Sequence, residues 1–396
     1  MQPAVKRTIR KIYAYKTVRE FILLYPLYNI MFASHGISTL QISTLLIIWS
    51  LTDVVTTIPT GVLADKFSRK HLLAFGQLLE ALGFLTWWLW PAYAGFALGF
   101  MLWGVGGSLD DGTYEAVVFD ELKQAGIESQ YVKVTGRAAS LSLMADCLAT
   151  ALAGIAVIYG YHLVIAGSIV AVIAAGLIAL WLPNTPRFEP VHEQHYLSML
   201  TAGVREAFQN RLLLALIVLG SFVGTIYGVL EEYVPLFFHQ TGLSLQVVPP
   251  LVAVTVLVAA LASFIAHRFE HLSTRTFMAL LFASGLCLML AGIALGLAAI
   301  ALIVAYTFFI KLLSVIYDGK IQHSIRGGLR ATVTSVSFVV MEVMSIATYL
   351  IYGLLSRYGG NFTAFTVIGA FVSLVALAYL ILAPRLLSGR FQPLSG

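Results

Sequence analysis

Long runs of apolar residues, separated by short polar loops, fill almost the whole chain. A helix needs about 20 mostly apolar residues to cross a bilayer, and runs of about that length recur from residue 18 to residue 383. The pattern predicts twelve transmembrane helices, at residues 18–34, 41–63, 71–90, 95–120, 137–158, 162–182, 212–238, 248–267, 276–295, 297–320, 331–353 and 362–383. The first is the least regular, because Arg19 and Glu20 enter it early and Pro26 interrupts it.

The longest polar stretch, residues 183–211, divides these helices into six and six. We therefore predict an all-α membrane protein of two pseudo-symmetric six-helix bundles, at residues 1–183 and 212–396, joined by a cytoplasmic linker at 184–211. A weak sequence similarity between the two halves supports an internal repeat. Asp-Gly pairs at residues 111–112 and 318–319 are each followed by an arginine at the start of the next predicted helix.

Basic residues are concentrated in alternate loops, which sets the orientation. Cytoplasmic loops of membrane proteins carry an excess of Lys and Arg. With the N-terminus inside, all but Lys311 and Arg357 of the 24 basic residues fall in cytoplasmic segments. We expect both termini to be cytoplasmic and, because no organellar transit pattern is present, the membrane to be a bacterial inner membrane. The net charge of +5 then needs no nucleic-acid partner.

The composition agrees with a membrane protein. Hydrophobic residues make up 59% and charged residues 11%, whereas soluble domains carry about a quarter charged residues. The two cysteines, Cys147 and Cys287, lie in apolar runs, so no disulfide is expected. There is no phosphate-binding glycine loop, serine nucleophile elbow or metal motif, so we expect neither an enzyme nor an ATP-driven pump, and no cofactor or metal. The expected partners are a small-molecule substrate, protons and membrane lipid, with the chain acting as a monomer.

The loop between the second and third predicted helices reads GVLADKFSRK over residues 61–70. It resembles the signature loop of the major facilitator superfamily in spacing, charge order and position, with Ser68 where the family usually has glycine. The resemblance implies that Gly61, Asp65 and Arg69 lock the cytoplasmic helix ends during alternating access. Asp120, at the cytoplasmic end of the fourth predicted helix, is a plausible partner for Arg69.

The same resemblance implies a layout for the helices. In this family the first, fourth, seventh and tenth helices line a central cavity, while the third, sixth, ninth and twelfth face lipid. A degenerate second copy of the loop lies at residues 267–270. The similarity is nearest to bacterial drug-efflux members. The glycine-proline pair that many drug–proton antiporters carry in the fifth helix is absent, which leaves the direction of transport open.

Ionisable residues inside predicted helices are the candidate functional groups, because a charge in the membrane is costly and is usually functional. The candidates for proton coupling or the substrate cavity are Asp53, Asp111, Glu115, Asp146, Glu231, Lys311, Asp318 and Glu342, with Tyr28, Asn29 and Tyr227 for polar contacts. Asp111 and Glu115 are four residues apart, so a continuous helix would place them on one face, where both do not ionise easily.

Lys311 and two further ionisable residues, Asp110 and Glu80, are harder to interpret. Lys311 needs an anionic partner, a substrate anion or a change of protonation. A carboxylate of the fourth, seventh or eleventh predicted helix is the expected partner, and the pair can be structural or functional. Asp110 should point to a different face from Asp111 and bind backbone groups. Glu80 breaks the expected layout unless it lies on the inner side of its helix or pairs with a neighbour.

These observations predict a secondary active transporter working by alternating access, coupled to a proton gradient and exporting a small amphipathic, cationic or zwitterionic compound. Two alternatives stay open at this point. One is a proton-coupled importer of a nutrient or siderophore, and the other is a membrane receptor that transports nothing.

Overall fold

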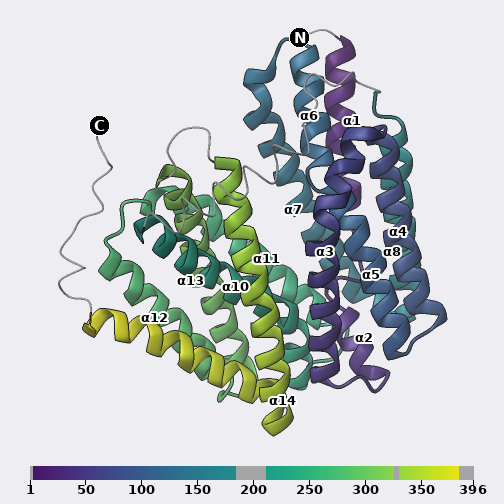
Figure 1. The fold of residues 1–396 in the computed structure, drawn as a ribbon. Helices are drawn as coiled ribbons and strands as arrows, with labels where there is room; N and C mark the ends of the chain where they lie inside the picture. The colour runs from purple at the N-terminus through teal and green to yellow at the C-terminus, as the bar shows by residue number, and fades with distance from the viewer. Residues whose placement is uncertain (1–2, 184–210, 325–329, 383–396) are drawn as a thin grey trace, which may run out of the picture. The chain divides into compact units, whose positions relative to one another are not determined.

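The computed structural model describes residues 3–183, 211–324 and 330–382, and within these ranges every regular element is helical (Figure 1). The chain forms two compact units. The first contains α1 (Pro3–Arg19), α2 (Tyr28–Ser34), α3 (Thr39–Lys66), α4 (Arg69–Leu89), α5 (Tyr93–Asp110), α6 (Thr113–Gln124), α7 (Tyr131–Ala156) and α8 (Tyr161–Leu180), with 3₁₀ turns at Glu128–Gln130 and Val157–Tyr159. Residues 244–253 group with it.

The second unit contains α10 (Arg211–Gln240), most of α11 (Val248–Ile265), a 3₁₀ turn at Ala266–Phe269, α12 (Thr274–Ala291), α13 (Leu297–Ser324) and α14 (Arg330–Leu382). Two predicted helices lie within α14, which has non-helical backbone at Gly359 and Gly360. Gly360 has φ +70°, a left-handed conformation that glycine adopts without strain.

All twelve predicted apolar segments are mainly helical in the structure. Nine helices in the described ranges, counting α14 once, are long and apolar enough to cross a membrane. The number of crossings and the division into two six-helix halves stay predictions. The predicted domain boundaries at residues 183 and 212 adjoin residues 184–210, which lie outside the described ranges.

The first predicted helix, at 18–34, is wrong in its boundaries. Helix α1 already begins at Pro3 and ends at Arg19, and α2 begins only at Tyr28. Pro26 has no N–H to donate and disfavours a helical residue before it, which breaks the helix. The backbone N–H of Leu24, exposed by the break, donates to Ser168 Oγ of α8 at 3.0 Å. The Ser168 hydroxyl thus accepts the hydrogen bond of the Leu24 N–H that the break leaves unpaired. Inside a membrane, where water is absent, such a backbone group needs a partner within the protein.

The predicted helix at 95–120 is also interrupted. Helix α5 ends at Asp110, and α6 begins at Thr113 after Gly112, whose φ is +72°. The Gly112 N–H donates to Glu115 Oε2 at 3.0 Å, so Glu115 caps the new helix. The expectation that Asp111 and Glu115 share one helix face is therefore wrong, because the glycine turn separates them.

Glycines bring α4 and α5 close together in antiparallel order. A Cβ at Gly76 would lie 2.8 Å from Gly106 O, and one at Gly83 would lie 2.8 Å from Gly99 O. Small residues of this kind let helix backbones approach without side chains between them. Helix α4 also packs against α8, and α3 packs against α5, so α4 and α5 hold the middle of the first unit.

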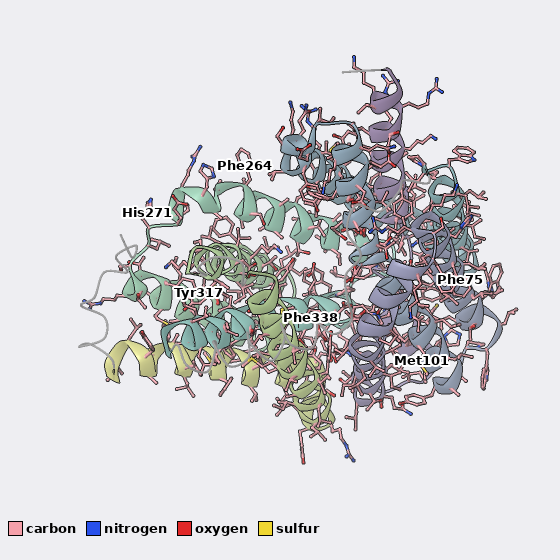
Figure 2. All side chains as sticks on the ribbon, turned by 45° about the horizontal axis from the view of Figure 1, so that its top comes forward. Phe75, Met101, Phe264, His271, Tyr317 and Phe338 are labelled. Carbon is pink, nitrogen blue, oxygen red and sulfur yellow. The ribbon has the colours of Figure 1, made fainter. Side chains whose placement is uncertain are left out.

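The outer surfaces of both units are apolar. Phe75 on α4 is 50% exposed, Met101 on α5 is 47% exposed and Phe264 on α11 is 71% exposed (Figure 2). Soluble proteins rarely expose so many large apolar side chains. Apolar faces of this kind are compatible with lipid, as expected for membrane helices. The buried polar groups are therefore the candidates for function.

Candidate functional site

A buried cluster of charged side chains joins three helices of the first unit. Arg19, at the end of α1, has Nε 3.2 Å from Asp110 Oδ2 of α5 and Nη2 3.6 Å from Glu80 Oε1 of α4. Tyr15, one turn before Arg19, donates its hydroxyl to Asp110 Oδ1. Both carboxylates have side chains no more than 2% exposed. The cluster is therefore an ionic network enclosed by protein.

This cluster corrects two expectations from the sequence. The count of loop charges places Arg19 among the cytoplasmic basic residues, but it lies beside Glu80 in the middle of the candidate span Arg69–Leu89. Asp110 is expected to bind backbone, but it binds Arg19 and Tyr15. Glu80 does pair with a neighbour, as one of the two expectations for it required. None of Tyr15, Arg19, Glu80 or Asp110 is among the predicted site residues.

The charges in the core of this cluster do not balance. One guanidinium, which keeps its charge at any physiological pH, faces two buried carboxylates. Uncompensated buried charge is costly. One proton on Glu80 or Asp110 would make the core neutral. The core therefore contains one carboxylate more than the single guanidinium can balance.

A second pair of charges lies at the rim of this cluster. Glu20, whose side chain is 31% exposed, accepts from Arg19 Nη1 at 2.9 Å and pairs with Lys16 Nζ at 3.2 Å. Lys16 also lies 5.3 Å from the centre of the Tyr114 ring on α6. Because Lys16 balances Glu20, the rim adds no net charge to the core.

Asp53 on α3 is tied to α5 by hydroxyl groups. Ser108 Oγ donates to Asp53 Oδ1 at 2.7 Å and lies 2.7 Å from Thr56 Oγ1. Asp53 also interacts electrostatically with Asp111, which is exposed where α5 ends. The structure thus brings together Asp53, Asp111 and the buried cluster within the first unit. Asp146 of α7, half-buried, accepts from Thr150 Oγ1 of its own helix at 3.3 Å.

Tyr28 and Asn29 on α2 are each 2% exposed. The Tyr28 ring packs among aromatic rings, including Trp87 at 6.1 Å and Phe100 at 5.7 Å between centroids. They are core residues in this conformation, and their contact with a ligand stays a prediction.

The remaining predicted site residues belong to the second unit. Lys311 Nζ of α13 lies 4.3 Å from the centre of the Tyr227 ring on α10, a cation–π contact. It has no ion pair with a carboxylate within the described part of this unit. Asp318 is exposed, and Glu231 and Glu342 are half-buried. Their roles in a cavity stay predictions.

Arg69 and Asp120 form an ion pair between the start of α4 and α6, the partnership that the sequence suggested. A Cβ at Gly61 would meet no atom of the described residues within 4 Å, so their packing does not require a glycine here. The side chain of Asp65 lies outside the described ones. The role of these residues as a conformational lock stays a prediction.

Glu121 follows Asp120 in α6, which is not among the nine candidate spans. Burial, and secondarily the Asp120 charge, raises the pKa of the Glu121 carboxyl to about 7. Its Oε1 is buried without a hydrogen-bond partner in the described residues. The carboxyl therefore titrates near neutral pH, beside the Arg69–Asp120 pair.

The sequence matches a known family of membrane proteins. The family model of the Major Facilitator Superfamily matches residues 20–349. The chain belongs to this superfamily. It is a multi-pass membrane transporter and not an enzyme, in agreement with the sequence prediction. None of the curated protein sequences matches it.

Solved structures of other facilitators share the fold. A point mutant of the nucleoside transporter NupG superposes with TM-score 0.78 at 13% identity, covering 95% of this chain and 99% of that chain. A bacterial homolog of the human lysosomal transporter Spinster, inward-facing and unoccupied, gives 0.76 at 14% identity and covers 99% and 100%. A D-xylose–proton symporter gives 0.66 at 13% identity and covers 95% of each. At these identities the likeness concerns the fold alone.

Proposed function

We propose that this facilitator is a proton-coupled exporter of a small amphipathic, cationic or zwitterionic compound. The observation that carries the proposal is the buried network in which Arg19 faces both Glu80 and Asp110. A permanent structural pair needs only one carboxylate per guanidinium. The second carboxylate gives the network a place for one exchangeable proton.

The acidic character of the first unit supports a cationic group on the substrate. Asp53 and Asp111 lie outside the Arg19 pairs, and one of them is exposed. Lys311 in the second unit keeps a carboxylate-bearing zwitterion within the proposed class. We further propose that the chain is a monomer of the inner membrane with both termini in the cytoplasm.

The test is flux in proteoliposomes under an imposed pH gradient. The panel is an amphipathic cation (ethidium), a nucleoside (uridine), a sugar (D-xylose) and a dipeptide (dialanine). The wild-type protein should move ethidium against its gradient, in exchange for protons. Glu80→Gln should abolish gradient-driven accumulation but keep counterflow, the exchange of labelled for unlabelled solute without a gradient. Glu128→Gln is the matched control, because Glu128 is exposed.

The sign of the flux separates export from the alternative, proton-coupled import of a nutrient. An exporter accumulates solute in everted vesicles whose interior is acidified, whereas a proton symporter accumulates it in right-side-out vesicles. A receptor would show no flux in either. Gradient-driven flux that survives both Glu80→Gln and Asp110→Asn would refute the proposed proton site.

A further inference from the structure

A group of aromatic side chains in the first unit is only partly enclosed. Trp87, Phe100 and Phe32 are at most 1% exposed and form its core. Trp49 of α3 and Trp103 of α5 are half-buried at its edge, with ring centroids 6.0 Å apart and an interplanar angle of 37°. Tyr25 lies edge-on to Trp103 at 6.3 Å. Two indole rings and a phenol ring therefore form one partly open aromatic surface.

The indole N–H of the enclosed Trp87 differs in its hydrogen bonding from those of Trp49 and Trp103 at the edge. Trp87 Nε1 donates to Phe96 O at 3.0 Å, as is usual for a tryptophan in a protein core. The N–H groups of Trp49 and Trp103 have no acceptor within the described part of the chain and are not among its fully buried polar atoms. Both remain able to donate to a molecule that enters beside them.

A carboxylate follows each of these two tryptophans along the chain. Helices α3 and α5 run parallel, because α4 connects them through short turns. Asp53 comes four residues after Trp49 and so follows it by about one turn of α3. Asp111 comes directly after the last residue of α5, eight residues after Trp103. The contact between Ser108 and Asp53 confirms that the two helices are in register here. Aromatic rings thus adjoin an acidic region.

Gly107 lies between Trp103 and Asp111, and it leaves the space beside them open. A Cβ on Gly107 would meet no atom of the described residues within 4 Å, whereas one on Gly106 would lie 2.7 Å from Gly76 O. A glycine inside a helix costs about 1 kcal/mol relative to alanine. At Gly106 the close approach of α4 accounts for the presence of glycine, but at Gly107 no packing contact among the described residues of this unit does. Room for a ligand beside the rings is a direct explanation.

We propose that Tyr25, Trp49 and Trp103, together with Asp53 and Asp111, form a binding subsite for an organic cation that carries a planar aromatic ring. The ring stacks against the indoles at Gly107, and the ammonium group reaches Asp53, about one turn beyond Trp49 on α3, and Asp111, just beyond the end of α5. Stacking and cation–π attraction select the ring, and charge pairing selects the cation. This proposal rests on the transport role proposed above and specifies its substrate class.

The test is equilibrium binding of tritiated 2-phenylethylammonium to the purified full chain in detergent, without any gradient. Two competitors remove one feature each: 2-cyclohexylethylammonium lacks the aromatic ring, and 2-phenylethanol lacks the charge. The labelled probe should bind about tenfold more tightly than either competitor. Equal competition by 2-cyclohexylethylammonium or by 2-phenylethanol would overturn the assignment of a ring-and-cation site.

Variants locate the binding. Trp103→Leu and Asp53→Asn should each weaken binding about tenfold, Trp103→Phe should keep most of it, and Gly107→Val should remove it. The matched control is Trp88→Leu, because Trp88 of α4 is 36% exposed and its ring adjoins only His162 among the aromatic side chains described. A single symmetric peak in size-exclusion chromatography shows that each variant is folded. Equal loss in Trp88→Leu and Trp103→Leu, or full binding by Gly107→Val, contradicts the site.

The two proposals can fail separately. Binding of 2-phenylethylammonium with no proton-driven flux of any solute would refute the coupling and leave the subsite standing. Proton-driven flux of a panel solute without binding of this probe would refute the subsite and leave the coupling standing.

Discussion

The unequal charges around Arg19 predict that two substitutions in the same network have very different consequences. Arg19→Gln leaves Glu80 and Asp110 buried together without a cation. Glu80→Gln leaves one guanidinium with one carboxylate, which is a neutral pair. We therefore expect Arg19→Gln to destabilise the protein much more than Glu80→Gln does, although both remove one charge from the network.

The distances set the size of the effect. At 3.2 Å and 3.6 Å, and with an effective dielectric constant of about 20, each Arg19–carboxylate attraction is about 5 kcal/mol before the cost of desolvation. Breaking a buried pair by removing one partner costs about 3–5 kcal/mol in measured cases. Arg19→Gln should lie in that range. Glu80→Gln should cost about 1 kcal/mol or less, because Asp110 still balances Arg19.

The assay is thermal unfolding of the detergent-purified variants, followed by intrinsic fluorescence at several pH values. The deficit of Arg19→Gln should shrink as the pH falls from about 8 to about 5, because protonated carboxyls no longer need a cation. The double variant Arg19→Gln/Glu80→Gln should be more stable than Arg19→Gln alone. This rescue distinguishes electrostatic imbalance from simple loss of packing by the arginine stem.

Equal instability of Glu80→Gln and Arg19→Gln would refute this account, since the network would then need both carboxylates ionised. A deficit of Arg19→Gln that does not depend on pH would refute it as well. Conservative Arg19→Lys is a further check. Lysine keeps the charge but cannot reach two carboxylates with a planar fork, so it should restore part of the stability.

Three other predictions follow from particular contacts. Because Arg69 and Asp120 form one pair, Arg69→Ala and Asp120→Ala should each reduce proteoliposome transport about tenfold, and the double variant should be no worse than the poorer single one. The pKa of the Glu121 carboxyl is raised to about 7, so its ionisation lowers the stability of the folded protein as the pH rises from about 4.5 to 7. Glu121→Gln should therefore unfold at a higher temperature than wild type at about pH 8 but not at about pH 4.5. A difference in unfolding temperature that does not depend on pH would contradict this. Gly106→Ala should destabilise the protein by about 1–3 kcal/mol in thermal unfolding, because its Cβ meets Gly76 O at 2.7 Å, whereas Gly107→Ala should leave the stability unchanged or raise it.

Most of the fold could be predicted from the sequence because membrane helices depend on one strong signal. Each needs a long apolar run, and each predicted run is mainly helical in the structure. The signal is weaker for helix ends and breaks. Pro26 and Gly112 mark the two breaks, but hydropathy alone carries both runs through them.

The candidate site was less accessible to sequence reasoning because it depends on which helices pack together. Counting basic residues by loop places Arg19 outside the membrane. Its position beside Glu80 depends on the packing of α1, α4 and α5, which no local pattern encodes. A signal is nevertheless present. Arg19 stands at the start of an apolar run, and Glu80 stands alone within one, so each needs a partner of opposite charge.

The breaks in α1 and α5 also explain why the charged network lies where it does. Arg19 is the last residue of α1 and Asp110 is the last residue of α5. The carbonyl groups at a helix end carry partial negative charge. They stabilise Arg19 at the end of α1, whereas at the end of α5 they add to the negative charge of Asp110. Both effects increase the attraction of a cation to this point. Interrupted helices whose ends bind ions are a recurrent feature of secondary transporters. The two interruptions of the regular apolar pattern thus place Arg19 and Asp110 at helix ends, where they pair in the charged network.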